Sequence, residues 1–84
     1  MTTHLEVLLP DMDAGNKTVK ATVSFWPVAV GASLQAGDDL LEVATDKANF
    51  VVPCPQTGIL REQRVQEDDR VCVGDVIAII EVAS

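Results

Sequence analysis

The residue with the clearest chemical potential in this sequence is a lysine between two short apolar runs. Lys47 lies in Thr45-Asp46-Lys47-Ala48, which separates Leu40–Val43 from Phe50–Val52. Two such runs joined by a few residues predict a β-hairpin, and aspartate is well suited to its turn. A lysine at a turn tip is usually a solvated charge, but its amine can also form an amide, which removes the positive charge.

Histidine and cysteine offer little further chemistry. His4 is the only histidine, so a metal site or a histidine-based triad would have to be built around that one residue. Cys54 and Cys72 are separated by seventeen residues, which fits neither a CxxC redox pair nor a zinc-binding spacing. We interpret both cysteines as small apolar residues and expect no bound metal.

Length and composition describe one small folded module. The chain has 84 residues, 48% of them hydrophobic, which suits a single domain over residues 1–84 with a compact core. Thirteen acidic against six basic residues give a net charge of −7, which disfavours nucleic acid and anionic membranes as partners. That charge can form a solvated face, attract a basic partner, or do both. We expect no signal peptide, no membrane span and a cytoplasmic location.

Five short runs rich in valine and isoleucine predict β-strands. They are Val19–Phe25, Leu40–Val43, Phe50–Val52, Ile59–Val65 and Val76–Val82. No window of twelve or more residues has the apolar spacing of an amphipathic helix, so we expect essentially no helix. Phe25 and Phe50 are candidates for the core, and Pro27 predicts an edge position or a bulge because it cannot donate a backbone hydrogen bond.

The two halves of the chain repeat one pattern. A shift of 37 positions places Gly37-Asp38 on Gly74-Asp75 and pairs several apolar positions in kind, such as Val23 with Leu60. Chance matches are easy in a valine-rich chain, but the shared Gly-Asp turn argues against chance. Self-similarity of this kind indicates that one structural motif is used twice.

The repeat predicts the fold class. Half-motifs of roughly residues 19–47 and 56–84, each with three or four short strands and an open apolar face, can bury those faces against each other. We expect an all-β domain: a flattened β-barrel or sandwich of two antiparallel sheets, about four strands each, with quasi-two-fold symmetry (a barrel-sandwich hybrid). The shift places Lys47 on Ser84, so the Lys47 turn and the C-terminus should lie at opposite ends.

The segment from Gly37 to Ala48 resembles the lipoyl domains of 2-oxo acid dehydrogenase complexes, within the biotinyl/lipoyl attachment family. Its Asp-Lys-Ala tip is similar to that family's lipoylation signature. The next segment, Val52-Pro53-Cys54-Pro55-Gln56-Thr57-Gly58, looks like the family's Val-Pro-x-Pro-x-x-Gly, and Trp26 also fits. The resemblance covers nearly the whole chain.

The resemblance implies a role for the lysine. A separate lipoate ligase or lipoyl transferase would attach lipoic acid to Lys47 through an amide, with Asp46 and Ala48 as flanking recognition residues without a catalytic role. The lipoyl-lysine would be a swinging arm that carries acyl groups and reducing equivalents. Its partners would be the 2-oxo acid decarboxylase, acyltransferase and dihydrolipoyl dehydrogenase components. The domain alone would be a non-catalytic carrier, and a longer parent chain would be a dihydrolipoyl acyltransferase.

Three features depart from the family pattern. Ala44 stands where an acidic residue is common, which bears on which partner or ligase recognises the tip. Asp68 stands where glycine is common, so we expect it in a backbone conformation that glycine adopts at a cost lower by roughly 1 kcal/mol. The segment 11–18 is slightly longer than the family's surface loop and lacks its acidic-glycine pattern, which bears on the identity of the parent complex.

Other carriers and modules share this fold. In a biotin carrier domain the lysine would be flanked by methionines, whereas Asp46 and Ala48 flank it here. A glycine-cleavage carrier protein also bears lipoyl-lysine but is longer and has a different tip. An unmodified interaction module, such as a fragment of a membrane-fusion or efflux adaptor, would share the half-repeat without the signature.

Overall fold

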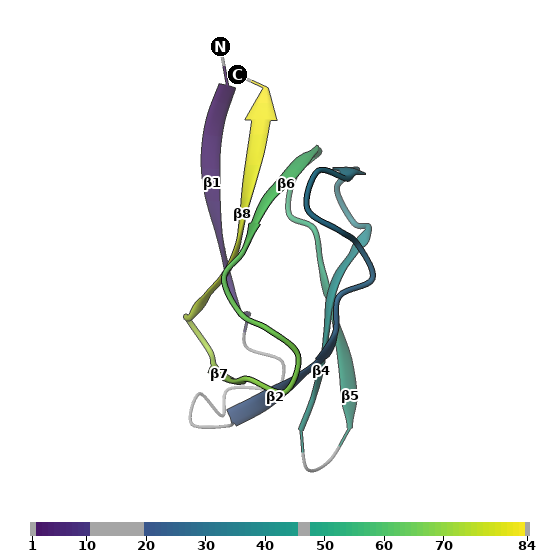
Figure 1. Cartoon of the computed structure of the whole chain (residues 1–84), viewed down its shortest axis with the longest axis vertical. Coiled ribbons are helices and arrows are strands. Elements are labelled where there is room, and N and C mark those ends of the chain that lie inside the picture. The colour runs from purple at the N-terminus through teal and green to yellow at the C-terminus, as the bar shows by residue number, and fades with distance from the viewer. Residues whose placement is uncertain (1, 11–19, 46–47, 84) are drawn as a thin grey trace.

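The regular structure of this chain consists of strands (Figure 1). The computed structural model describes residues 2–10, 20–45 and 48–83. The strands are β1 (Thr2–Leu8), β2 (Lys20–Phe25), β3 (Ser33–Leu34), β4 (Asp39–Ala44), β5 (Asn49–Pro53), β6 (Gly58–Gln63), β7 (Arg70–Cys72) and β8 (Val76–Ala83). The five predicted strands are confirmed as β2, β4, β5, β6 and β8, whereas β1, β3 and β7 were not predicted. The all-β class is confirmed, and the described residues form no helix.

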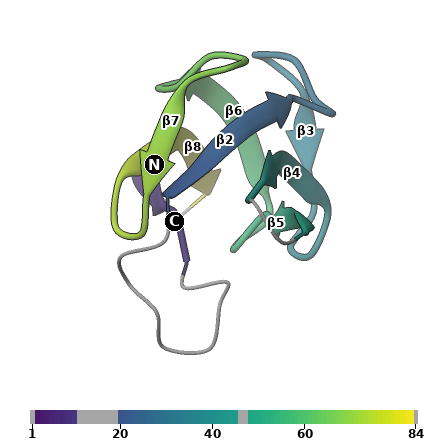
Figure 2. The ribbon, with the colours of Figure 1, turned by 90° about the horizontal axis from the view of Figure 1, so that it is seen from below.

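The strands form two four-stranded antiparallel sheets. One sheet has the order β1-β8-β6-β3 and the other β5-β4-β2-β7. We call them the β8 sheet and the β4 sheet. Viewed from one end (Figure 2), the strands of both sheets surround a common interior. This is the flattened barrel or sandwich that the repeat predicted.

The core lies between the two sheets and is apolar. Its residues are Val7, Leu9, Ala21, Val23, Leu34, Leu40, Leu41, Val43, Val52, Cys54, Leu60, Val71, Ile77, Ala78, Ile80 and Val82. No polar or charged residue is buried among the described residues. Burial of such side chains is the main stabilising term for a domain of this size. Cys54 is 2% exposed, which agrees with its interpretation as a small apolar residue.

The internal repeat appears in the backbone hydrogen bonds. The amide of Gly31 donates to the carbonyl of Leu60 at 2.7 Å, and the amide of Asp68 donates to that of Val23 at 2.9 Å. Each pair becomes the other under the shift of 37 positions. Gly31 and Asp68 both have positive φ, at 96° and 72°. The quasi-two-fold symmetry is therefore real, and the unusual conformation predicted for Asp68 is confirmed.

Two side chains make a second exchanged pair of contacts. The indole Nε1 of Trp26 donates to the carbonyl of Val65 at 3.0 Å, and the Nε2 of Gln63 donates to that of Val28 at 3.1 Å. These four positions also interconvert under the same shift. Each bond ties the loop after one strand to the opposite half, so the two halves are joined by polar contacts as well as by the core.

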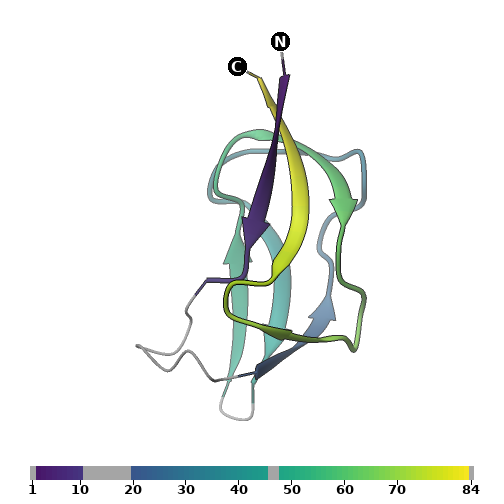
Figure 3. The ribbon, with the colours of Figure 1, turned by 90° about the vertical axis from the view of Figure 1, so that its left-hand side faces the viewer.

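The β4–β5 hairpin and the chain ends lie at opposite ends of the molecule (Figures 1 and 3). Thr2 pairs with Ala83 at one end, and Ala44 pairs with Asn49 at the other. This agrees with the arrangement expected from the repeat, as far as the described residues go. Asp46 and Lys47 themselves lie outside the described residues, as does the segment 11–18.

The prediction that Phe25 is a core residue is wrong. Its side chain is 42% exposed, whereas Phe50 packs against the core as expected. The register between β2 and β4 shifts between Val23 and Phe25, because Val23 pairs with Val43 but Phe25 pairs with Glu42. A bulge of this kind breaks the alternation and turns the residue after it away from the core. Pro27 lies beyond β2, which ends at Phe25, so the edge position or bulge expected at Pro27 does not occur there.

Candidate functional site

The end of the β4–β5 hairpin is held by three hydrogen bonds between two residues. The amide of Thr45 donates to the carbonyl of Ala48 at 2.8 Å. The amide of Ala48 donates to the hydroxyl Oγ1 of Thr45 at 3.2 Å, and that hydroxyl donates to the carbonyl of Ala48 at 3.2 Å. Only Asp46 and Lys47 separate these residues in the sequence. The two residues that flank the tip, Thr45 and Ala48, are therefore held together by hydrogen bonds.

The base of the hairpin is anchored in the core. Val43 pairs with Phe50, and Leu41 pairs with Val52. Three of these side chains are buried, and Phe50 packs against the core. Functional groups are positioned more precisely by such packed strands than by free loops. The hairpin is therefore a stiff support from which a side chain can project.

Of the three predicted site residues, the structure describes Ala48. It is exposed and lies at the end of the hairpin, next to the exposed Asn49. Asp46 and Lys47 lie outside the described residues, so their predicted roles stay predictions. Sequence reasoning missed the contribution of Thr45, whose hydroxyl bridges the ends of the turn. The sequence signal for this contact is a threonine three residues before Ala48, because threonine hydroxyls commonly form hydrogen bonds with backbone groups a few residues away in turns.

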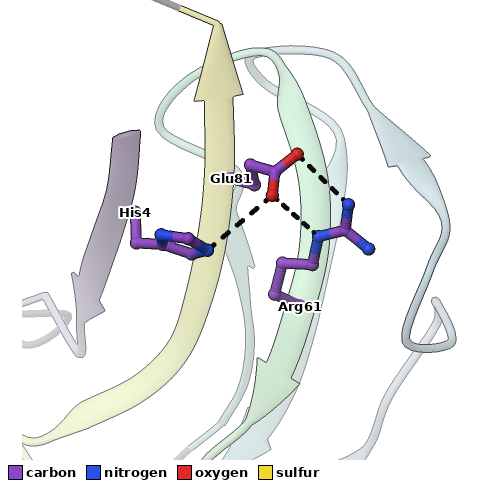
Figure 4. Close-up of polar contacts among 3 residues, drawn as sticks. All are labelled: His4, Arg61 and Glu81. Carbon is purple, nitrogen blue, oxygen red and sulfur yellow. Dashed lines mark hydrogen bonds and ion pairs between the residues drawn. The ribbon is translucent and has the colours of Figure 1, made fainter. Parts of the chain in front are cut away.

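A cluster of charged side chains lies on the other sheet, near the chain ends (Figure 4). The guanidinium of Arg61 donates two hydrogen bonds to the carboxylate of Glu81, each at 3.1 Å. His4 Nε2 lies 3.7 Å from the same carboxylate. His4, Glu81 and Arg61 come from β1, β8 and β6, so the cluster links three neighbouring strands.

The surroundings of Glu81 and those of Cys54 each shift the pKa of the group. The hydrogen bonds from Arg61 lower the pKa of Glu81, although the partial burial of the carboxylate acts in the opposite direction. Burial raises the pKa of the Cys54 thiol, which also donates to the carbonyl of Gln56 at 3.0 Å. A thiol with a raised pKa is a poor nucleophile at neutral pH. Cys54 therefore behaves as a packing residue.

The described residues contain no group of three or more histidine, cysteine, aspartate or glutamate side chains that could hold a metal ion. In the same ranges, no helix is long and apolar enough to cross a membrane.

The chain matches a known domain family over most of its length. Residues 6–80 match the biotin-lipoyl family, which is described as biotin-requiring enzyme. The chain belongs to this family. The match includes the β4–β5 hairpin and most of both halves of the repeat, and it leaves out only the beginning of β1 and the end of β8 among the strands.

Three relatives are components of three different dehydrogenase complexes. The chain is 39% identical over 74 residues to a dihydrolipoyllysine-residue acetyltransferase component of the pyruvate dehydrogenase complex from Corynebacterium glutamicum, which covers 88% of the chain. It is 33% identical over 75 residues to a dihydrolipoyllysine-residue succinyltransferase component of the 2-oxoglutarate dehydrogenase complex from Staphylococcus saprophyticus, covering 89%. It is 37% identical over 67 residues to a lipoamide acyltransferase component of the branched-chain alpha-keto acid dehydrogenase complex from Bacillus subtilis, covering 80%.

These relatives are much longer proteins. The matched region is 11% of the Corynebacterium protein, 17% of the Staphylococcus protein and 16% of the Bacillus protein. The likeness therefore concerns one domain of each relative.

Proposed function

We propose that this domain is a lipoyl carrier and that Lys47 is its attachment site. The observation that supports this most strongly is the hairpin end, where bonded Thr45 and Ala48 leave only Asp46 and Lys47 between them. The Asp-Lys-Ala signature stands at this point. The relatives named above act on dihydrolipoyllysine or lipoamide, which favours lipoic acid over biotin.

The described residues around the hairpin fit a tethered group. A covalently attached arm requires an accessible amine on a firm support, and it requires no enclosing cavity. Ala48 and Asn49 are exposed, and the strands beneath them are anchored in the core. When bound, lipoic acid supplies a dithiolane whose disulfide can accept an acyl group as a thioester and can be restored from the dithiol by exchange with another redox pair.

The protein's own contribution is positioning. In this proposal the hairpin holds the modified side chain away from the sheets, so that the arm is not buried against its own domain. Tethering keeps the reactive end at a high local concentration among successive active sites. Asp46 and Ala48 serve as flanking recognition residues for the modifying enzyme. No side chain of the domain has to act as an acid or a base.

The proposed partners are the enzymes that such an arm would visit. They are the 2-oxo acid decarboxylase, acyltransferase and dihydrolipoyl dehydrogenase components, together with a lipoate ligase or lipoyl transferase that installs the group. The relatives are components of such complexes, which supports this set. The proposed location is the cytoplasm, and two free thiols at Cys54 and Cys72 are consistent with a reducing compartment.

Reductive acylation tests the carrier role. The chain is lipoylated, then incubated with pyruvate, 2-oxoglutarate or a branched-chain 2-oxo acid, each with its matching decarboxylase component, and the acyl group is detected by intact mass. We expect acylation with one or more of these pairs. Lys47→Arg is the matched variant, because it keeps the charge and removes the amine that takes lipoic acid. Without the lipoyl sulfur atoms it should remain unacylated. A wild-type chain that accepts no acyl group from any pair would refute the proposal.

A further inference from the structure

The hydroxyl of Thr45 holds the end of the β4–β5 hairpin through its contacts with Ala48. In a four-residue β-turn the amide of the fourth residue commonly donates to the carbonyl of the first. Here the amide of Ala48 donates to the side-chain Oγ1 of Thr45, and the same hydroxyl donates to the carbonyl of Ala48, each at 3.2 Å. The Thr45 amide donates to that carbonyl as well, at 2.8 Å. The shape of this turn therefore depends on a side chain and not on the backbone alone.

The strands beneath the turn have their own support (Figure 1). Strand pairing extends to Ala44 and Asn49, one residue short of Thr45 and Ala48 on each side. Before that pair, Val43 lies in the core. Thr45 is half-buried and Ala48 is exposed. Removal of the hydroxyl would thus alter the end of the hairpin and leave the packed part in place.

The internal repeat shows that the scaffold requires no hydroxyl at this position. The shift of 37 positions places Thr45 on Val82, near the end of β8. Val82 is 8% exposed and pairs with Thr3. Valine and threonine have the same branched shape, so the two equivalent positions differ in the hydroxyl. The hydroxyl occurs in the half that carries Lys47, and the repeated fold does not account for it.

Lipoylation depends on the orientation of the lysine amine. The amine, after losing one proton, attacks the carbonyl carbon of lipoic acid that ATP has activated as an acyl adenylate. A carbon–nitrogen bond forms, the carbon–oxygen bond to AMP breaks with its electron pair leaving on AMP, and the nitrogen releases a second proton. The nucleophile is the lysine nitrogen itself, on a four-carbon stem. Misplacement of a reacting group by about 1 Å can cost a factor of roughly 10² in rate.

The steps after lipoylation depend less on the turn. Once lipoic acid is attached, the reacting sulfur atoms lie at the far end of a longer flexible chain. Rotation about the bonds of that chain can compensate for a change of direction at the turn. The geometry of the turn should therefore matter most to the enzyme that modifies the lysine, and less to the enzymes that use the arm afterwards.

We propose that Thr45 is the positioning residue for Lys47 in lipoylation. Its hydroxyl fixes the two ends of the turn, so that the amine meets the activated lipoyl group in one orientation. This rests on the proposed carrier function. Thr45 acts through Ala48, does not contact the reacting atoms and accepts no proton from them. A turn that is ordered before the modifying enzyme binds lowers the entropic cost of aligning the amine during the reaction.

Substitutions at Thr45 separate the hydroxyl from the shape of the side chain. Thr45→Val keeps the branched shape and removes the hydroxyl, whereas Thr45→Ser keeps the hydroxyl. Thr57→Val is the matched control, because the exposed Thr57 also accepts a backbone hydrogen bond, from the Ala36 amide at 3.2 Å. Thr57 precedes β6 and lies outside the hairpin. Lipoyl transfer is measured in a single turnover from lipoate ligase preloaded with lipoyl adenylate, at increasing concentrations of each variant.

The expected result is slower transfer with little change in binding. Thr45→Val should lower the maximal transfer rate about tenfold and leave the half-saturating concentration within about twofold. Thr45→Ser and Thr57→Val should stay within about twofold in both quantities. Hydrogen exchange of the Ala48 amide should be faster in Thr45→Val, with exchange in the core of β4 unchanged. After complete lipoylation, checked by intact mass, Thr45→Val should undergo reductive acylation within about twofold of the wild-type rate.

Several outcomes would overturn the positioning role. Transfer to Thr45→Val at the wild-type rate would do so, and so would a serine variant as slow as the valine variant. A loss confined to the half-saturating concentration would assign the hydroxyl to binding of the ligase. An equal loss in Thr57→Val, or in the reductive acylation of Thr45→Val, would indicate a general effect on the domain. Failure of the carrier function is a different result, because the wild-type chain itself would then take no lipoyl group.

Discussion

The strained conformation of Asp68 allows a stability prediction whose size follows from the structure. Asp68 has a φ of 72°, its side chain is exposed, and its amide bond to the Val23 carbonyl does not involve the side chain. A left-handed conformation costs a residue with a Cβ about 1–2 kcal/mol, and aspartate is among the more tolerant residues. Glycine at this position relieves that cost but adds freedom to the unfolded chain, worth roughly 0.5–1 kcal/mol. Asp68→Gly should therefore stabilise the domain by about 0.5–1 kcal/mol.

The repeat supplies the opposite experiment at Gly31. Its φ is 96°, and a Cβ added there would meet no atom within 4 Å. Gly31→Ala therefore adds backbone strain without a clash. We expect it to destabilise the domain by about 0.5–1 kcal/mol, because the reduced freedom of the unfolded chain offsets part of the strain. The two substitutions occupy equivalent positions, so one should raise stability and the other lower it.

Urea unfolding followed by fluorescence measures both changes. Trp26 is the only tryptophan and is held by its bond to Val65, so its emission reports on the folded state. For a domain of this size 1 kcal/mol corresponds to roughly 4–8 °C in Tm. Glu67→Gln controls for the removal of one negative charge near Asp68. Loss of stability in Asp68→Gly, or no change in Gly31→Ala, would refute the assignment of strain to this backbone position.

Three further predictions concern packing, pH and thiol reactivity. Gly58→Ala should destabilise the domain by about 1–3 kcal/mol in urea unfolding, because an added Cβ would overlap the β8 backbone. The free energy of unfolding should fall as the pH drops below about 4.5, because the pKa of Glu81 is lower in the folded state than in the unfolded one; Arg61→Gln should weaken this pH dependence, and an unchanged profile would contradict the pairing. Iodoacetamide should modify the half-exposed Cys72 first and reach Cys54 only after unfolding, as followed by intact mass, since burial raises the pKa of Cys54; equal rates would contradict its burial.

The strands with strong local patterns could be predicted from the sequence alone. Runs such as Val76–Val82 are long enough to specify a strand without their neighbours, and the repeated Gly-Asp turn revealed the two-fold arrangement. β3 and β7 have only two and three residues, and they exist because distant strands pair with them. β1 likewise depends on β8, at the other end of the chain. Local patterns carry little information about such pairings.

The candidate site was predictable in part. Turn chemistry placed the hairpin correctly, and the core beneath it follows from the apolar residues on both sides. The exposure of Phe25 was not predictable, because a bulge leaves the alternation of residue types unchanged while it alters which face a residue occupies. The interaction of Thr45 with Ala48 across the turn depends on geometry that residue types alone do not fix.

The proposed carrier function depends most on the chemical state of one side chain, that of Lys47. The direct measurement is tandem mass spectrometry of peptides from the chain after treatment with lipoate ligase, ATP and lipoic acid. We predict a single lipoyl group, located on Lys47, and no label on Lys17 or Lys20, the other two lysines. An unmodified chain, a lipoyl group on either of those lysines, or a biotinyl group on the chain isolated from cells would contradict the account.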